Sequence, residues 1–175
     1  MERTEWRLVE DAAVQKREMY LDSIRQAFPQ DMLAGERVAL DCSNGALSAF
    51  ALDMFEAFGA DVTIVGNSPN GSNINDGVGS ECPQSLAAVF ELGAFDMGFA
   101  FDGDGDRMIA FDESGSKLSG EATLGLLAIR AKEQGALKGD VLVTTAQSNL
   151  GLDAALGKVG ISVRRVYIGD KFVSR

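Results

Sequence analysis

The feature that most constrains the fold of this chain is a regular alternation of short apolar segments with segments of helical periodicity. Residues 36–41 (ERVALD) and 61–66 (DVTIVG) are short, apolar and β-favouring, and residues 46–58 between them have helical periodicity. This order predicts a βαβ unit, in which the two strands run parallel. We therefore expect an α/β fold with a mixed, mainly parallel sheet between helices.

The alternation extends along the whole sequence. Further helices are predicted at residues 6–28, 83–92, 120–135 and 149–160. Further strands are predicted at residues 95–101, 108–112, 140–145 and 161–168. Residues 1–117 thus predict one complete α/β domain, and residues 118–175 predict an incomplete second unit of the same kind. An incomplete unit leaves a free sheet edge, so we expect a homodimer or a domain swap through it.

Composition excludes several classes of protein. Hydrophobic residues make up 46% of the chain, enough for a sizeable core, and the net charge of −10 argues against a nucleic-acid partner. No apolar run approaches the roughly 20 residues of a membrane span, so we expect no membrane partner. The chain has no histidine, which excludes Ser-His-Asp and Cys-His catalysis and His-ligated zinc. Two cysteines and no export signal predict a cytoplasmic protein with free thiols.

The strongest local pattern is FAFDGDGDR, residues 99–107. Asp102, Asp104 and Asp106 alternate with glycines that let the backbone bend sharply, and they follow a predicted strand. Three close carboxylates repel one another unless a hard divalent cation binds an oxygen of each. Three carboxylates, one Mg²⁺ and Arg107 sum to zero formal charge. The pattern therefore predicts an open Mg²⁺ site at the carboxyl end of a strand, where ligands bind in α/β sheets.

Two other structures would use the same residues. An EF-hand places aspartates at this spacing, but it needs a glycine where Arg107 stands and helices where the flanks predict strands. A solvated acidic turn is the other alternative, although three aspartates at strict spacing are a costly way to build a turn. Ser43, Asn44, Ser148 and Asn149 precede predicted helices, where N-caps are expected and anion-binding N–H groups are the alternative.

The FAFDGDGDR segment resembles the metal-binding loop of the α-D-phosphohexomutase superfamily. Four other segments resemble that family in order and spacing: DCSNGA (41–46), SPNGSNIND (68–76), SNLGL (148–152) and GDKFV (169–173). The likeness runs from about residue 12 to the last residue. Within the family, SNLGL and NIN are similar to the phosphoglucosamine branch rather than to the phosphomannomutase/phosphoglucomutase branch.

The resemblance implies a four-domain enzyme, with residues 1–117 as its second, metal-binding domain and residues 118–175 as part of its third. It implies conversion of glucosamine 6-phosphate into glucosamine 1-phosphate through a phosphoserine and a bisphosphate intermediate. It implies a catalytic role for Arg107 beside the phosphate and a substrate-binding role for Lys171. The family's serine loop and sugar-recognition loop have no counterpart here, so we expect the chain alone to be inactive. Lys171 replaces the usual arginine, which keeps the charge but loses bidentate geometry.

Other functions remain open at the level of sequence. A fragment of a phosphomannomutase/phosphoglucomutase would share the same loop, and its substrate would be a phosphorylated hexose rather than a hexosamine. A Mg²⁺-dependent phosphatase or phosphotransferase would use an aspartate of this loop as its nucleophile, although Gly105 and Asp106 stand where such enzymes typically have Thr or Val. A non-catalytic Ca²⁺- or Mg²⁺-binding module is the third alternative.

Overall fold

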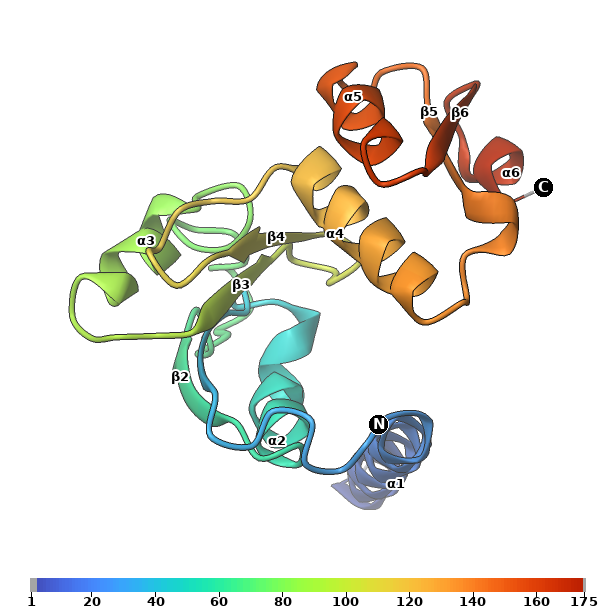
Figure 1. Ribbon diagram of the computed structural model, residues 1–175. Coiled ribbons are helices and arrows are strands. Elements are labelled where there is room, and N and C mark those ends of the chain that lie inside the picture. Colours follow the sequence, from blue (N-terminus) through green and yellow to red (C-terminus); the bar gives the residue numbers. More distant parts are fainter. Residues whose placement is uncertain (1–2, 175) are drawn as a thin grey trace. The chain divides into compact units, whose positions relative to one another are not determined.

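The computed structural model describes residues 3–174, and these residues divide into two compact units with their boundary in the sequence after Lys117. Each unit is an assembly of helices and strands of its own (Figure 1). Within residues 3–174, no helix is both long enough and apolar enough to cross a membrane.

The first unit contains a four-stranded sheet in the order β2-β1-β3-β4. Its strands are β1 (Arg37–Asp41), β2 (Asp61–Val65), β3 (Met97–Phe101) and β4 (Met108–Phe111). The inner strand β1 is parallel to both β2 and β3, and β4 is antiparallel to β3. The predicted mixed, mainly parallel sheet is therefore confirmed.

Helices cover both faces of this sheet (Figure 1). Residues 3–117 form three α-helices and one 3₁₀ helix: α1 (Arg3–Ala27), η1 (Ala46–Ala49), α2 (Ala51–Glu56) and α3 (Gln84–Phe90). Val38 and Leu40 of β1 pack in one cluster with Ala51 of α2, whereas Ala39 between them packs with Leu86 of α3. Successive strand residues point to opposite faces, so the alternation places one core on each side of β1.

The helix predicted over residues 46–58 is interrupted in the structure. A 3₁₀ turn, η1, precedes α2, and Phe50 between them departs from helical geometry with φ −150° and ψ −4°. The Phe50 ring packs edge-to-face against Tyr20 of α1, with ring centroids 5.5 Å apart. Apolar periodicity alone could not predict this break, because the periodicity is the same on both sides of it.

The second unit is smaller. Its elements are α4 (Gly120–Glu133), η2 (Lys138–Asp140), β5 (Val141–Thr145), α5 (Gly151–Gly157), β6 (Ser162–Val166) and α6 (Asp170–Val173). In the described part of the chain, β5 and β6 pair in parallel with each other and with no further strand. Ala128, Leu152, Leu156 and Ile161 form its core. Ser119 caps α4 by accepting the N–H of Ala122 at 3.1 Å.

Candidate metal centre

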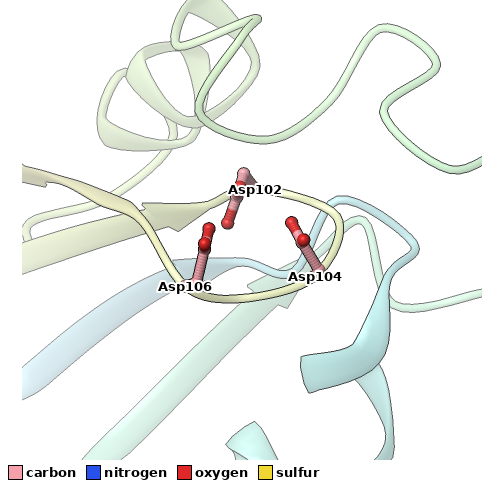
Figure 2. A group of neighbouring side chains, drawn as sticks. All are labelled: Asp102, Asp104 and Asp106. Atoms are coloured by element: carbon pink, nitrogen blue, oxygen red, sulfur yellow. The ribbon is translucent and has the colours of Figure 1, made fainter.

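Three aspartates converge in the short loop that joins β3 to β4. Asp102, Asp104 and Asp106 each offer a carboxylate oxygen, and these oxygens all lie within 4.8 Å of one another. Figure 2 shows the three side chains pointing toward one another across the loop. Asp102 is only 1% exposed, whereas Asp104 and Asp106 are open to solvent. The arrangement is a cluster of hard oxygen donors with one buried wall and one open side.

The loop backbone closes on itself to hold this geometry. The N–H of Gly105 donates to the carbonyl of Asp102 at 3.1 Å, and the N–H of Asp102 donates to the carbonyl of Arg107 at 3.2 Å. Gly105 has φ +75°, a conformation that glycine adopts without strain. The flanking strands β3 and β4 pair antiparallel, so the helices that an EF-hand requires are absent here.

Arg107 binds the buried aspartate of the cluster. Its backbone N–H donates to Asp102 Oδ1 at 3.1 Å, and its Nε and Nη2 lie 3.0 and 2.8 Å from Asp102 Oδ2. The guanidinium also lies 3.5 Å from Asp106 Oδ1 and 3.5 Å from Glu81 Oε1. Its side chain nevertheless stays 67% exposed. Arg107 therefore presents a cation at the open side of the aspartate cluster.

The carboxylates perturb one another's protonation. Burial by itself would raise the pKa of Asp102, but hydrogen bonds from the Arg107 backbone and with the neighbouring aspartates, and then the Arg107 charge, lower it to about 2. The pKa of Asp106 is raised, first by its hydrogen bond with Asp102 and then by the negative charges of Asp104 and Asp102. The two pKa values move in opposite directions because hydrogen bonds and Arg107 favour the charged form of Asp102, whereas the neighbouring carboxylates disfavour the charged form of Asp106.

Three loops meet around this cluster, because the parallel strands β1, β2 and β3 end at the same sheet edge. We call the loop between β3 and β4, residues 102–107, the metal loop. The loop after β1 contacts it through the Ala46 N–H, which donates to the Gly103 carbonyl at 2.9 Å. The loop after β2 reaches it through the Ser80 N–H, which donates to the Phe101 carbonyl at 2.8 Å. Backbone hydrogen bonds thus join the metal loop and the adjoining Phe101 to two segments that lie about 20 to 60 residues before it in the sequence.

The N-cap expected at Ser43 and Asn44 is wrong. Both residues adopt left-handed backbone conformations, with φ 57° and 51°. The Ser43 hydroxyl donates to the Phe101 carbonyl, and Asn44 Oδ1 accepts the N–H of Ser68 at 2.9 Å. Their side chains bridge loops because the neighbouring loops, rather than free helix N–H groups, surround them.

Ser148 and Asn149, which precede α5, form different hydrogen bonds. Asn149 Oδ1 accepts the N–H of Gly151 at 2.7 Å in the turn before α5, but the N-cap of this helix is Leu150 and no side chain caps it, so the N-cap expected at this pair is also wrong. Ser148 instead shares a hydrogen bond of 2.6 Å with the hydroxyl of Thr144.

Lys171 belongs to the second unit and is not among the residues that the first unit brings together. No helix is predicted after residues 161–168, but the structure places Lys171 in the single turn of α6, with its amine 4.9 Å from the centre of the Phe172 ring. Two residues of the first unit escaped sequence reasoning. Glu81 lies beside Arg107, and no sequence signal marks it. Asp41 is a buried acid, and its place at the end of an apolar strand is the signal that could have found it.

Comparison with protein families agrees with this division of the chain. The family model for phosphoglucomutase/phosphomannomutase alpha/beta/alpha domain II matches residues 18–115, and the model for domain III matches residues 119–175. Two similar relatives are phosphoglucosamine mutases of Halalkalibacterium halodurans and Bacillus subtilis. Each is 46% identical over 154 residues, which cover 88% of this chain and 34% of the relative. The chain thus spans about a third of the length of these curated relatives.

Solved structures have the same fold at low sequence identity. A phosphoglucomutase/phosphomannomutase family protein from Burkholderia thailandensis superimposes with a TM-score of 0.75 at 20% identity, covering 90% of this chain and 34% of that one. An N-acetylglucosamine-phosphate mutase of the alpha-D-phosphohexomutase superfamily has a TM-score of 0.65 at 16% identity, covering 91% of this chain and 33% of that one. These likenesses establish a shared fold.

Proposed function

The chain belongs to the phosphoglucomutase/phosphomannomutase family, and on that premise we propose that it supplies the metal-binding part of a Mg²⁺-dependent phosphosugar mutase. We place the whole protein in the phosphoglucosamine branch, because curated relatives at 43–46% identity carry that name. Its reaction would convert glucosamine 6-phosphate into glucosamine 1-phosphate through a phosphoserine and a bisphosphate intermediate. The observation that supports this proposal is the convergence of three aspartate oxygens beside an exposed arginine.

The donor set fits Mg²⁺. This ion prefers oxygen ligands in octahedral geometry and usually keeps several waters, so a partly open cluster of three carboxylates suits it. Asp102, Asp104 and Asp106 would hold the ion, and the open side next to Asp104 and Asp106 would admit a phosphate oxygen. A bound Mg²⁺ would supply charge stabilisation during phosphoryl transfer.

Arg107 would act on the phosphate directly. Asp102 contacts its Nε and Nη2, Glu81 lies 3.5 Å from its Nη1, and most of the side chain still faces solvent. A guanidinium forms two parallel hydrogen bonds with a phosphate group, which orient as well as attract it. We assign to Lys171 a weaker role in attracting the phosphosugar, because an ammonium group acts as a point charge.

The chain by itself would catalyse no turnover. Positioning contributes on the order of 7–11 kcal/mol to reactions between well-oriented groups. The 175 residues include no histidine and no serine in the context of the family's nucleophile, so a metal loop alone has nothing to position against the sugar. A coupled assay of the purified chain with glucosamine 6-phosphate, Mg²⁺ and a sugar bisphosphate tests this. Turnover above that of a variant lacking all three aspartates would refute it.

A chimaera tests the proposed function itself. In it, the 154 aligned residues of this chain replace their counterparts in the Bacillus subtilis phosphoglucosamine mutase. We expect activity on glucosamine 6-phosphate that needs Mg²⁺ and is lost in Asp104→Asn. A folded chimaera that is inactive beside an active parent would contradict the proposal. A trapped aspartyl-phosphate would favour the phosphatase alternative, and tighter binding of Ca²⁺ than of Mg²⁺ would favour the non-catalytic module.

A further inference from the structure

A buried carboxylate lies behind the metal loop without being part of it. Asp41, the last residue of β1, is 0% exposed. Its Oδ1 accepts the N–H of Ser43 at 3.0 Å, and its Oδ2 accepts the N–H of Gly79 at 2.7 Å and the hydroxyl of Ser85 at 2.5 Å. Within the described part of the chain, no lysine or arginine forms an ion pair with it. Burying such a charge is expensive unless donors satisfy it, so these three donors are what keep Asp41 buried.

The donors to Asp41 come from both loops that touch the metal loop. Ser43 lies in the loop after β1, and Gly79 lies in the loop after β2. Each of these two loops also donates to the Phe101 carbonyl. One donor is the hydroxyl of Ser43, and the other is the N–H of Ser80, the residue after Gly79. Phe101 directly precedes Asp102, the buried member of the aspartate cluster. Asp41 is thus connected to the metal loop through two short chains of hydrogen bonds.

The conformation of the first loop depends on the Asp41 contact. Ser43 has φ 57°, a left-handed conformation that is uncommon for residues other than glycine. The bond from its N–H to Asp41 and the bond from the Asn75 N–H to its carbonyl, at 2.8 Å, hold it there. Three residues further on, Ala46 binds the Gly103 carbonyl. The metal loop is therefore held at the residue on each side of Asp102.

We propose that Asp41 is a positioning residue of the metal loop, which acts through Ser43 and Gly79 to hold Asp102 in the geometry that a divalent cation needs. This inference rests on the metal site proposed above. Asp41 is not itself a ligand in this scheme, because both of its oxygens already accept hydrogen bonds from the protein. Partners that orient metal ligands from behind typically change metal affinity by about 10- to 100-fold when they are removed.

The test is Mg²⁺ titration calorimetry on the 175-residue chain and three variants. Asp41→Asn removes the charge and one acceptor, and Ser43→Ala removes the bond to Phe101 while keeping Asp41. Val89→Ala is the matched control, because Val89 is a core residue of α3 and its apolar side chain makes no hydrogen bond to Asp41 or to these loops. We expect about tenfold or greater loss of Mg²⁺ affinity in Asp41→Asn and Ser43→Ala, and unchanged affinity in Val89→Ala despite its lower unfolding temperature.

Terbium luminescence provides a second readout, because its lifetime reports the number of waters on the bound ion. A displaced loop contributes fewer protein oxygens, so we expect more bound waters in Asp41→Asn and Ser43→Ala than in the wild type. If the wild type binds no Mg²⁺, the proposed metal site is wrong. If the wild type binds and both variants bind as well as Val89→Ala does, the positioning role is wrong. If Asp41→Asn does not fold, Ser43→Ala decides between these outcomes.

Discussion

Replacing Gly45 by alanine tests whether tertiary packing outweighs backbone entropy at this position, because the two have opposite effects on the free energy of unfolding. Gly45 has φ −107°, which alanine adopts freely, so backbone entropy alone would stabilise the variant by about 0.4–1 kcal/mol. In the folded protein, however, an added Cβ would lie 2.8 Å from both the carbonyl carbon and the Cα of Gly103, and closer still to its oxygen. These atoms are backbone of the metal loop itself. The loop must therefore move if the methyl group is to fit.

The expected cost follows from what the movement breaks. Overpacking of this kind typically costs about 1–3 kcal/mol. It also weakens the bond from the Ala46 N–H to the Gly103 carbonyl, which contributes about 0.5–1.5 kcal/mol. After the entropic gain is subtracted, we expect a net loss of about 0.5–4 kcal/mol in the free energy of unfolding. Because Mg²⁺ demands near-ideal geometry, we also expect at least a roughly tenfold rise in its Kd.

Gly93→Ala is the control for this experiment. It introduces the same methyl group in the same unit, but its Cβ would meet only the Phe95 ring at 3.5 Å, an ordinary contact. Urea unfolding and Mg²⁺ titration calorimetry on both variants supply the comparison. We expect Gly93→Ala to be as stable as the wild type or more stable by up to about 1 kcal/mol, because it keeps the entropic gain without the clash. If Gly45→Ala is as stable as the wild type and binds Mg²⁺ equally well, the contact between the loop after β1 and the metal loop does not hold the metal site in place.

Four further predictions follow from the same geometry. Asp104→Asn should abolish Mg²⁺ binding in titration calorimetry, because two carboxylates hold the ion poorly; retained binding would contradict the three-ligand site. In the chimaera, Arg107→Ala should lower kcat and leave Mg²⁺ affinity nearly intact, and an unchanged rate would rule out its role at the phosphate. Burial and then the charge of Asp41 raise the pKa of the Cys42 thiol to about 12, so it stays protonated at pH 8–9. Iodoacetamide should therefore alkylate Cys82 first in the native chain, and equal rates at the two thiols would show that Cys42 is accessible. Light scattering should find a dimer formed through the free edges of the β5–β6 sheet, and a monodisperse monomer would contradict that.

Local sequence determined the order of the secondary structure and the chemistry of the loop. Apolar residues at strand and helix spacing predicted β1, β2 and β3 within one or two residues, since burial on the two faces of a sheet requires that spacing. Alternating aspartates and glycines after β3 indicated a cation site, because like charges at that spacing need a counter-charge. Both inferences depend on residues that are close along the chain.

Tertiary structure decided what supports the loop. Asp41, Ser43 and Gly79 lie about 20 to 60 residues before the metal loop, and only the parallel arrangement of β1, β2 and β3 brings them to one sheet edge. The same contacts override the local preference of Ser43 for a helix cap, because its hydroxyl finds the Phe101 carbonyl instead. Arg107 likewise turns back onto Asp102, a direction that the order of residues does not specify. Spacing along the chain predicts which groups are available, and packing between distant segments determines which of them meet.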